Sequence, residues 1–510
     1  MNAPAKIDRV QQWVQRPKGR AVIARLQAFA PQLVLAAILL ITFAAFAPTL
    51  TDWFMRDDFL FLRAAQTASS PWDYILDSFD YRTTGPPVDY TFYRPLFQII
   101  SFAFYKAFHL EAWAHHLVVV GVHLANVVFV WLIARKLTGR LLIAHGAALI
   151  FALHPAYPTA VSWINAGVAV LATLPYLASL WLFLKHLDGG PRRLWYYGGS
   201  FLAFIAALLF HPETLVLTAL IVLAYGLLYA RSTRDLLAVG PWLRLIPFVV
   251  AAIAYFQIQS WVRDHSLVQS TVFGFGPWFD DNYWRYLALP IYPYDLGTSF
   301  TYTPRHLIAT IVFLLISVTV GLAGPGRPHA TTFVLYWFYF AIMPLSTSLL
   351  GASGRKLYTA GPSLAILFAM FGVMLWDARP RRLGGWATGL ALALLLALTV
   401  GMILRGVETK ASFRHAMFES KQLIDQMREA YPSLPPDTRV YLVDVPVLLV
   451  ALTDNYVRDE LRLYYGDVEV RTFRSEAKFR EAQLEIGDDD IVFGYCPPLD
   501  LRDCDPLRFQ

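Results

Sequence analysis

The sequence is poor in charged residues and in cysteine. Only 16% of its 510 residues are Asp, Glu, Lys or Arg, and Cys occurs twice. So little charge is atypical of a soluble protein, and two cysteines are too few for a disulfide scaffold. The chain also has no glycine-rich phosphate loop, no unit repeated at a fixed period and no short signal with a small-residue cleavage site. These absences argue against a small secreted module, a solenoid and a nucleotide-binding enzyme.

Long apolar runs take the place of charge. Hydrophobic residues make up 56% of the chain, and the mean hydropathy is +0.45. This composition is typical of a polytopic membrane protein. Because a helix needs about 20 apolar residues to cross a bilayer, we predict eleven transmembrane helices. They lie at residues 31–50, 113–134, 141–154, 161–184, 195–211, 213–230, 243–262, 306–323, 331–350, 359–376 and 386–405.

Loop charge predicts the direction of the spans. The net charge is +6, but residues 408–510 carry 13 basic and 20 acidic side chains, a net charge of −7 that leaves +13 for the rest. With the N-terminus inside, every short inner loop is net basic, whereas the outer loop 52–94 has seven Asp against four Arg. We therefore expect a basic cytoplasmic arm at 1–30 and an outer C-terminus. The basic loops should face anionic lipid, and no nucleic-acid partner is indicated.

Two parts of this topology depend on short segments. The apolar segment Tyr93–Phe108 is brief and contains two cations and a proline, so we expect an interfacial helix on the outer leaflet and not a span. The tight hairpins at Pro155–Pro158 and at His211-Pro212-Glu213 decide the direction of all later spans, because one span more or fewer there would invert them.

The character of the chain changes after Arg405. Residues 412–430 have the pattern of an amphipathic helix, and strand-like runs follow at 439–445, 468–473 and 490–495. We therefore expect a small extracytoplasmic α/β domain at 406–510. Cys496 and Cys504 both fall in it. Their spacing of eight residues, with no partner His, is a poor zinc pattern, so a disulfide is the better prediction.

The most informative residues are two adjacent aspartates, Asp57 and Asp58, directly beyond the first span. Aromatic and aliphatic neighbours make the membrane surface there a poor solvent for charge. Burial and mutual repulsion should push the two pKa values apart, which suits one carboxylate to proton abstraction. The alternative is a solvated loop that contains two acids. The position at the mouth of a large membrane domain favours a site, but the sequence does not tell which Asp is the base.

Other charged residues gather at outer helix ends. Glu213 lies in a hairpin between apolar spans, where a carboxylate is costly unless paired. It could position an acceptor, or bind a divalent metal with the Asp pair. Arg355 and Lys356 are cations on an outward loop, so an anionic partner explains them as well as contact with lipid headgroups does.

Histidines give no metal signature. His154 and His211 each precede Pro and lack metal-ligand spacing, so structural hydrogen bonds are the commoner explanation. Whether a metal binds is left unknown. In the loop 263–305, an aromatic cluster could stack on sugar faces or form an interfacial belt. It consists of Trp278, Tyr283, Trp284, Arg285 and Tyr286.

Short motifs occur in a recognisable order: Asp57-Asp58, Tyr93-Arg94-Pro95-Leu96, then His116, His123 and Asn126, Phe151-Ala152-Leu153-His154-Pro155, His211-Pro212-Glu213, and Gly354-Arg355-Lys356-Leu357-Tyr358. This order resembles the GT-C superfamily of polyprenyl-phosphate-sugar glycosyltransferases. Within it, the sequence is most similar to the membrane half of the TMTC-type (transmembrane and tetratricopeptide-repeat) O-mannosyltransferases and their bacterial relatives. The resemblance runs over much of residues 31–375.

The resemblance implies a GT-C-like membrane domain at 31–405 in a bacterial inner membrane. It implies an inverting enzyme that moves a sugar from a polyprenyl-phosphate donor to a hydroxyl acceptor on a protein, glycan or lipid at the outer face. Asp57 or Asp58 would be the base, with Glu213 as a further catalytic candidate, while cations would bind the phosphate and an apolar groove would exclude water. The substrate-contacting candidates are Tyr93, Arg94, His154, His211, Arg355, Lys356 and Tyr358.

The chain also departs from the pattern of these relatives. They usually have acidic residues shortly after the His-Pro, where Thr159 and Asn165-Ala166-Gly167 stand here. The acidic C-terminal domain replaces the tetratricopeptide repeats. The acceptor and the sugar therefore stay open.

Other classes of protein share some of these features. A transporter or flippase for a lipid-linked sugar would show internal repeats and broken helices at the midplane, whereas the charges here lie at outer helix ends. A ligase that moves a whole glycan is a variant of the main prediction. A non-enzymatic scaffold would have no need of Asp57-Asp58.

Overall fold

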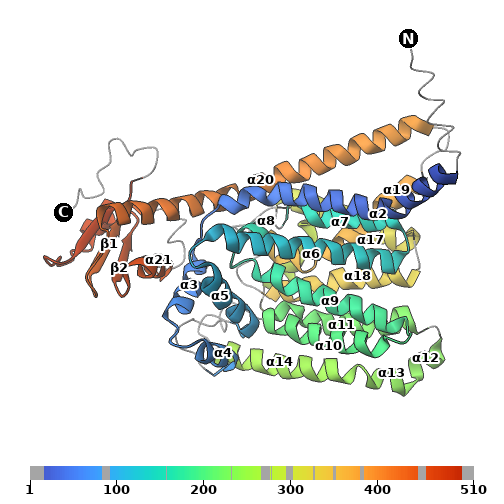
Figure 1. Ribbon diagram of the computed structural model, residues 1–510, viewed down its shortest axis with the longest axis horizontal. Coiled ribbons are helices and arrows are strands. Elements are labelled where there is room, and N and C mark those ends of the chain that lie inside the picture. The colour runs from blue at the N-terminus through green and yellow to red at the C-terminus, as the bar shows by residue number, and fades with distance from the viewer. Residues whose placement is uncertain are drawn as a thin grey trace, which may run out of the picture.

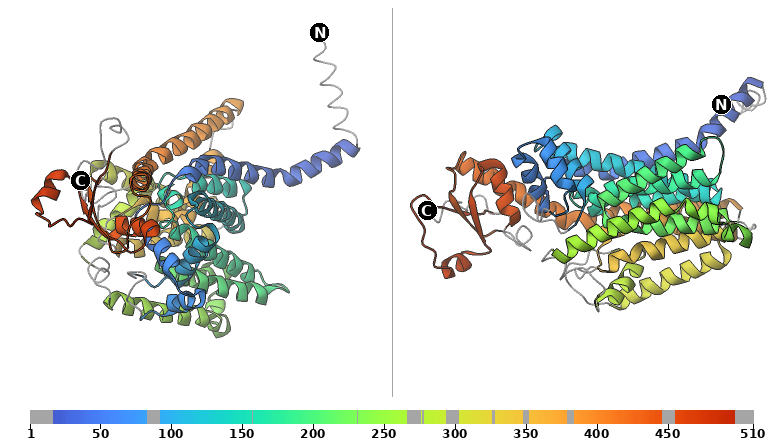
Figure 2. Two further views of the ribbon diagram at one scale, coloured as in Figure 1. Left: turned by 60° about the vertical axis from the view of Figure 1, so that its left-hand side comes forward. Right: turned by 90° about the horizontal axis from the view of Figure 1, so that it is seen from below.

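The computed structural model describes residues 17–82, 92–156, 158–230, 232–265, 276, 278–293, 303–325, 328–347, 352–378, 384–445 and 455–496. In this part of the chain, long helices run roughly side by side, and a small sheet lies beyond one end of them (Figures 1 and 2). Residues 1–16 of the predicted cytoplasmic arm lie outside the described residues.

The bundle is built from ten long or apolar helices within the described ranges. They are α2 (Pro17–Phe46), α6 (Ala112–Thr138), α7 (Leu141–Leu153), α9 (Val168–Leu187), α10 (Arg193–Phe210), α11 (Val216–Leu223), α14 (Ile246–His265), α17 (Pro304–Ala323), α18 (Pro328–Ile342) and α19 (Gly361–Ala378). An eleventh helix, α20 (Gly384–Ala430), starts apart from the bundle and reaches it further along (Figures 1 and 2). Each predicted span has a helix at its position, which confirms the polytopic α-helical fold.

Nine helical segments of the described chain are long and apolar enough to cross a membrane. The predicted span 141–154 corresponds to the 13-residue apolar helix α7, and the predicted span 386–405 corresponds to the start of α20. Helix α7 packs in the middle of the bundle against α2, α6 and α19. Its small residues allow this close packing, since a Cβ atom on Gly146 would lie 3.3 Å from the Cβ of Ala369. The count of eleven spans stays a prediction.

Short helices cover the end of the bundle nearest the sheet. They are η1 (Ala47–Thr51), α3 (Asp57–Thr67), α4 (Pro71–Phe79) and α5 (Pro95–Phe108). Helix α4 begins after Ser70, whose hydroxyl accepts hydrogen bonds from the backbone N–H groups of Trp72 and Asp73. Helix α5 is the segment expected to lie at the interface. It has 14 residues and packs against α3, α4 and α10.

The C-terminal part is a small α/β domain, as predicted. Strands β1 (Arg439–Val443), β2 (Glu469–Phe473) and β3 (Ile491–Gly494) form a parallel sheet in the order β2-β1-β3, joined by α21 (Asn455–Tyr465) and α22 (Glu476–Glu481). The central strand is buried on both faces, as is usual in parallel sheets. Val440 and Leu442 pack in one cluster with Leu423 and Met427 of α20, and Tyr441 packs in another.

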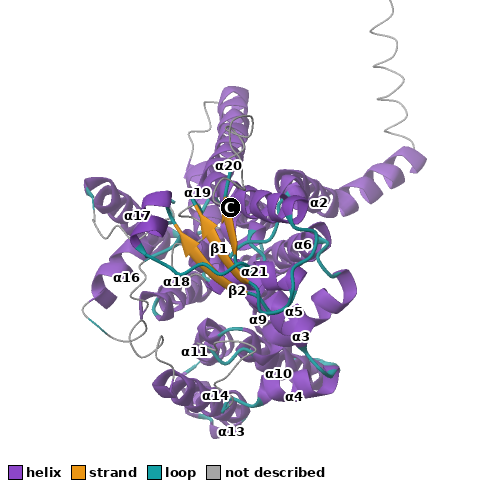
Figure 3. Ribbon diagram, turned by 90° about the vertical axis from the view of Figure 1, so that its left-hand side faces the viewer, coloured by secondary structure: helices purple, strands orange, loops and turns teal. Residues whose placement is uncertain are grey.

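Helix α20 differs from the prediction. We expected a break between the span 386–405 and an amphipathic helix at 412–430, but one helix of 47 residues runs from Gly384 to Ala430. No proline interrupts it. The glycine nearest its middle, Gly406, lies against Pro158, because a Cβ atom there would be 3.3 Å from the Cγ of Pro158. Tertiary packing of this kind outweighs the low helix propensity of glycine. The helix connects the bundle directly to the sheet, which overlies the bundle end in Figure 3.

Candidate functional site

Asp57 and Asp58 form the first turn of α3, at the end of the bundle that faces the sheet. The residue before them, Arg56, has φ 51° and ψ −124°, a left-handed backbone that a non-glycine residue rarely adopts. Strained backbone of this kind clusters at functional sites. The abrupt start of α3 turns both carboxylates inward, toward the loop that contains Asn165.

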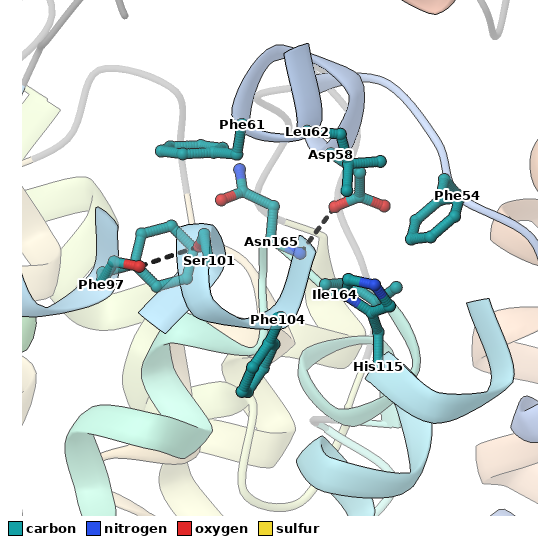
Figure 4. Close-up of a pocket in the computed structure, with 10 residues that line it drawn as sticks. All are labelled: Phe54, Asp58, Phe61, Leu62, Phe97, Ser101, Phe104, His115, Ile164 and Asn165. Atoms are coloured by element: carbon teal, nitrogen blue, oxygen red, sulfur yellow. Dashed lines mark hydrogen bonds between the residues drawn. The ribbon is translucent and has the colours of Figure 1, made fainter. Parts of the chain in front are cut away.

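Asp58 is held on both sides by backbone donors. Its side chain is only 3% exposed. Oδ2 accepts a hydrogen bond from the N–H of Met55 (3.0 Å). Oδ1 accepts one from the N–H of Asn165 (2.7 Å), which Figure 4 shows as a dashed line. Burial, and then the charge of Asp57, raise the pKa of Asp58 well above its usual range. Asp58 therefore ties the start of α3 to the loop of Asn165.

Asp57 has a different environment. The side-chain amide of Asn165 donates a hydrogen bond to Oδ2 of Asp57. Oδ1 of Asp57 is buried and has no hydrogen-bond partner among the described residues. Burial raises the pKa of Asp57, while the charge of Arg355 acts most strongly in the opposite direction. Of the two carboxylates, Asp57 is the one with an oxygen available to a substrate hydroxyl.

Two cations flank Asp57. The guanidinium of Arg355 lies 4.5 Å from the ring centroid of Trp163, and that of Arg56 lies 6.0 Å from it. Both charges interact with the carboxylate of Asp57. The negative charge of Asp57 is therefore stabilised by two cations.

The segment that carries Arg355 is positioned by a glycine. The 3₁₀-helix η5 (Gly354–Tyr358) passes so close to the turn after α7 that a Cβ atom on Gly354 would lie 1.9 Å from the carbonyl oxygen of Ala156. Only glycine allows this approach. In a 3₁₀-helix, consecutive side chains point about 120° apart. Arg355 accordingly interacts with Asp57, whereas Lys356 interacts with Glu213.

A second group of charges surrounds Glu213. Nδ1 of His211 lies 3.6 Å from Oε2 of Glu213. The same nitrogen accepts a hydrogen bond from the backbone N–H of Glu213. The ring of Phe92 stacks on His211, and the guanidinium of Arg94 lies 4.0 Å from the centroid of Phe92.

Arg94 connects the two groups of charges. Its guanidinium interacts with both Glu213 and Asp57, and its Nε is buried without a hydrogen-bond partner among the described residues. Burial lowers the pKa of Arg94 to about 10, so the side chain stays charged at neutral pH. The structure thus brings Asp57, Glu213, Arg94, Arg355 and Lys356 together, although they are far apart in sequence.

Two other predicted residues, Tyr93 and His154, mainly hold backbone in place. The hydroxyl of Tyr93 donates a hydrogen bond to the carbonyl of Phe79 (3.2 Å). The backbone carbonyl of Tyr93 accepts one from the hydroxyl of Tyr255 (2.9 Å). Both ring nitrogens of His154 bond to backbone: Nδ1 accepts from Ala156 N–H (3.1 Å), so Nε2 is the nitrogen that donates, to the carbonyl of Pro290 (3.3 Å).

Tyr358 is fully buried, and this placement contrasts with the expected contact with substrate. Its hydroxyl lies 2.6 Å from Nδ1 of His123 and accepts from the amide of Asn126 (3.1 Å). These contacts support a positioning role for Tyr358, because they anchor η5 to α6.

The aromatic cluster near residue 280 is not one surface. Tyr286 is fully buried, Arg285 is buried and paired with Asp281 at 2.6 Å, and Trp284 is about half exposed. The side chain of Trp278 lies outside the described residues. Cys496 is buried and forms a disulfide, in agreement with the prediction, and its predicted partner, Cys504, lies outside the described residues.

Three residues of the site were not singled out from the sequence. Asn165 had drawn attention only as a departure from the acidic residues of the relatives. Trp163, beside it, supplies the ring under Arg355 and Arg56. Tyr456 comes from α21 of the C-terminal domain, and its hydroxyl interacts with Arg56, Asp57 and Arg355. No spacing rule links Tyr456 to residues about 400 positions earlier.

In the described part of the chain, no group of three or more His, Cys, Asp or Glu side chains is arranged to hold a metal ion. Asp57 and Asp58 instead accept hydrogen bonds from Asn165 and from backbone. The described residues therefore do not fit the divalent metal considered from the sequence.

Comparison with known proteins places the fold. No protein-family model matches the sequence, and no curated protein matches it either. The structure is similar to that of ArnT from Cupriavidus metallidurans bound to undecaprenyl phosphate, with a TM-score of 0.50 and 16% identity, over 90% of this chain and 89% of that chain. It is also similar to the archaeal oligosaccharyltransferase AglB from Archaeoglobus fulgidus in complex with an inhibitory peptide and a dolichol-phosphate. There the TM-score is 0.52 and the identity 12%, over 89% of this chain and 65% of that chain.

Both matches extend over nearly all of this chain. At identities of 12% and 16%, such likeness defines the fold and leaves the activity to be argued from the site. The chain therefore has the GT-C fold, as the order of its motifs indicated.

Proposed function

We propose that this protein is an integral-membrane glycosyltransferase that moves a sugar from a polyprenyl-phosphate donor to a hydroxyl acceptor, with inversion at the anomeric carbon. The observation that carries the proposal is the environment of Asp57. One oxygen of its carboxylate is buried and has no hydrogen-bond partner among the described residues, and cations interact with it at the end of a membrane bundle. Solved structures of the same fold contain undecaprenyl phosphate or dolichol-phosphate, which supports a polyprenyl-phosphate donor.

Asp57 is the general base in this proposal. The acceptor hydroxyl donates its hydrogen bond to Oδ1 of Asp57 and loses its proton to that oxygen as it attacks. A new bond forms between the acceptor oxygen and the anomeric carbon, while the bond from that carbon to the phosphate oxygen breaks. The electron pair of that bond leaves with the polyprenyl phosphate. A base in this position typically contributes about 10²–10⁴-fold in rate.

Cations stabilise the charge that develops on the leaving phosphate. Among the cations, Arg355 acts most strongly on Asp57, and Arg94 interacts with both Asp57 and Glu213. Guanidinium groups bind phosphate through paired hydrogen bonds, and their effect is large where water is excluded. Glu213, held beside His211 and Lys356, would orient hydroxyl groups of the sugar or of the acceptor.

Asp58 has a positioning role. Both of its oxygens are used by backbone N–H groups of Met55 and Asn165, and these bonds fix the distance between α3 and the loop of Asn165. Since the described residues do not fit a metal ion, no step is assigned to one.

The proposal extends to location. The site and the C-terminal domain lie at the same end of the bundle, and the loop charges favour the outer face for that end. We therefore place residues 52–94 and 406–510 on the extracytoplasmic side of a bacterial inner membrane, with the N-terminus in the cytoplasm. The relation to TMTC-type O-mannosyltransferases belongs to the same proposal.

A second candidate is transfer of a whole lipid-linked glycan. The likeness to an oligosaccharyltransferase favours it. The two candidates differ in the donor they consume, since one uses a single sugar on a polyprenyl phosphate and the other a preassembled oligosaccharide.

The test is sugar transfer by the purified protein in lipid nanodiscs. Undecaprenyl-phosphate-linked mannose, other undecaprenyl-phosphate monosaccharides and a lipid-linked oligosaccharide are offered separately, with membranes and extracytoplasmic extract of the source cells as acceptor. Movement of label from the lipid to the acceptor from a monosaccharide donor supports the proposal, and movement only from the oligosaccharide supports the second candidate. Translocation of donor across the bilayer without any transfer would contradict both and support a flippase.

A further inference from the structure

The C-terminal domain sits directly on the helix that carries the Asp pair. The guanidinium of Arg63 on α3 donates to the carbonyl of Arg462 (3.1 Å) and pairs with Asp467 (3.0 Å), and Gln66 donates to the carbonyl of Leu463 (3.0 Å). Leu463 also belongs to an apolar cluster formed mainly by α3 and α5. Helix α21 is therefore fixed against α3 by polar and apolar contacts.

This contact brings the first turn of α21 to the catalytic end of α3. Tyr456 lies in that first turn and is only partly buried. Its hydroxyl interacts electrostatically with Asp57, Arg56 and Arg355 and makes no hydrogen bond to any described residue. Burial raises the pKa of Tyr456 to about 12, so the hydroxyl keeps its proton at neutral pH and can donate a hydrogen bond.

Two other tyrosines on α21, Tyr464 and Tyr465, have contacts that are typical of a structural role. The hydroxyl of Tyr465 donates to the carbonyl of Tyr431 (2.9 Å), inside the C-terminal domain. The ring of Tyr464 packs in the apolar cluster at α3 and lies 5.0 Å from the guanidinium of Arg428. Tyr456 differs from both because its hydroxyl faces the charges of the site.

The guanidinium groups of Arg56 and Arg355 favour a bound anion. Arg56 and Arg355 lie near the same ring, that of Trp163, and their like charges repel each other. A phosphate between them would relieve this repulsion, and a neighbouring hydroxyl would add a third donor.

We infer that Tyr456, Arg56 and Arg355 together bind the phosphate of the polyprenyl donor, so that the phosphate site is divided between the membrane bundle and the C-terminal domain. The inference rests on the proposed function and deepens it. The hydroxyl of Tyr456 donates to a phosphate oxygen while the guanidinium groups neutralise its charge. The C-terminal domain thus completes the donor site and is more than a cover over it.

Binding of lipid tests the inference without knowledge of the acceptor. The full-length protein in nanodiscs is titrated with undecaprenyl phosphate and, separately, with the uncharged undecaprenol. Tyr456→Phe removes the donor and keeps the ring. Loss of one hydrogen bond of about 1 kcal/mol corresponds to about fivefold weaker binding of undecaprenyl phosphate, with undecaprenol binding unchanged.

Two variants make the comparison specific. Tyr465→Phe is the matched control and should bind undecaprenyl phosphate like the wild type, because its hydroxyl bonds inside the domain. Tyr456→Gln retains a donor and should recover part of the affinity that Tyr456→Phe loses. Thermal unfolding of each variant checks that the domain is intact.

The contrary outcomes separate the two proposals. If the wild type prefers undecaprenyl phosphate to undecaprenol but Tyr456→Phe binds both like the wild type, the role of Tyr456 is wrong and the proposed function stands. Equal weakening for both lipids would also overturn the inference, because it would indicate a loosened domain. If the wild type itself shows no preference for the phosphate, the proposed function fails.

Discussion

Asn165 bonds to both aspartates of the site at once. Its side-chain amide donates to Oδ2 of Asp57, and its backbone N–H donates to Oδ1 of Asp58 at 2.7 Å. The two acids are therefore oriented by one residue from a different loop, and only Asp57 keeps an oxygen without a hydrogen-bond partner in the described chain. This difference separates the roles of two neighbours that look equivalent in the sequence.

The first prediction concerns these roles. Asp57→Asn keeps the size of the side chain but removes the proton acceptor, so turnover should fall by about 10²–10⁴-fold while binding of undecaprenyl phosphate stays near normal. Asp58→Asn should reduce turnover less and lower thermal stability, since it disturbs the two backbone contacts of Asp58. Sugar transfer and melting temperature measure the two effects. Near-normal turnover in both variants, with the fold intact, would refute the carboxylate-base mechanism.

A second prediction concerns Arg355. Arg355→Ala removes a cation near Asp57 and should weaken binding of undecaprenyl phosphate by about tenfold or more, because a charged hydrogen bond is worth roughly 1.5–3 kcal/mol. Arg439→Ala is a suitable control, since the half-exposed Arg439 forms its ion pair with Asp490, inside the C-terminal domain. Titration of both variants with undecaprenyl phosphate gives the comparison. Equal affinities for the two would remove Arg355 from the phosphate site.

Much of the fold was predictable from sequence because bilayer thickness dictates the length of apolar runs. The strands of the C-terminal domain were equally visible, since β-branched and aromatic residues dominate them. Asp57 and Asp58 could be singled out because two adjacent carboxylates in apolar surroundings beside a membrane span are costly unless they have a function. The pattern did not show that α20 is continuous, because the change from apolar to amphipathic composition suggested a break that the helix does not have.

The partners of the Asp pair were out of reach of sequence reasoning. Asn165 and Tyr456 carry no signal in their own neighbourhoods, and they meet Asp57 only through the packing of distant elements. Arg355 and Lys356 are adjacent in sequence, yet the 3₁₀ turn directs them to different acids. Such assignments depend on backbone geometry that a single sequence does not encode locally.

The third prediction concerns Gly354. A Cβ atom there would meet the carbonyl oxygen of Ala156 at 1.9 Å, and backbone on both sides cannot move away cheaply. Gly354→Ala should therefore cost about 1–3 kcal/mol of stability, lower the melting temperature and reduce turnover by shifting Arg355. Gly372→Ala is the matched control, because a Cβ atom on Gly372 meets nothing within 4 Å. A Gly354→Ala protein as stable and active as the control would show that the close approach is not required.

The fourth prediction concerns topology. Ser433 is exposed in the loop before β1, at the same end of the bundle as Asp57, and Arg192 is exposed before α10. Ser433→Cys should react with an impermeant thiol reagent in intact cells, whereas Arg192→Cys should react only after the membrane is permeabilised. The parent chain, which keeps both native cysteines, is the blank. The reverse pattern of labelling would put the site on the cytoplasmic side.

The fifth prediction uses Asn165 to tune the proposed base. Burial already raises the pKa of Asp57, and the base works in its deprotonated form, so activity should fall as the pH drops through that raised pKa. Asn165→Asp keeps the size of the side chain but replaces the amide donor with a second negative charge. The like charge and the lost hydrogen bond both favour the protonated form of Asp57, which moves the acidic limb of the rate profile to higher pH. Turnover should be lower than in the wild type near neutral pH and should recover at alkaline pH.

Asn165→Ser is the control, because it shortens the side chain without adding charge and should lower the rate with a smaller shift of the acidic limb. The measurement is turnover against pH at saturating donor for all three proteins. An acidic limb that stays in place in Asn165→Asp would mean that Asp57 is not the group whose ionisation governs transfer.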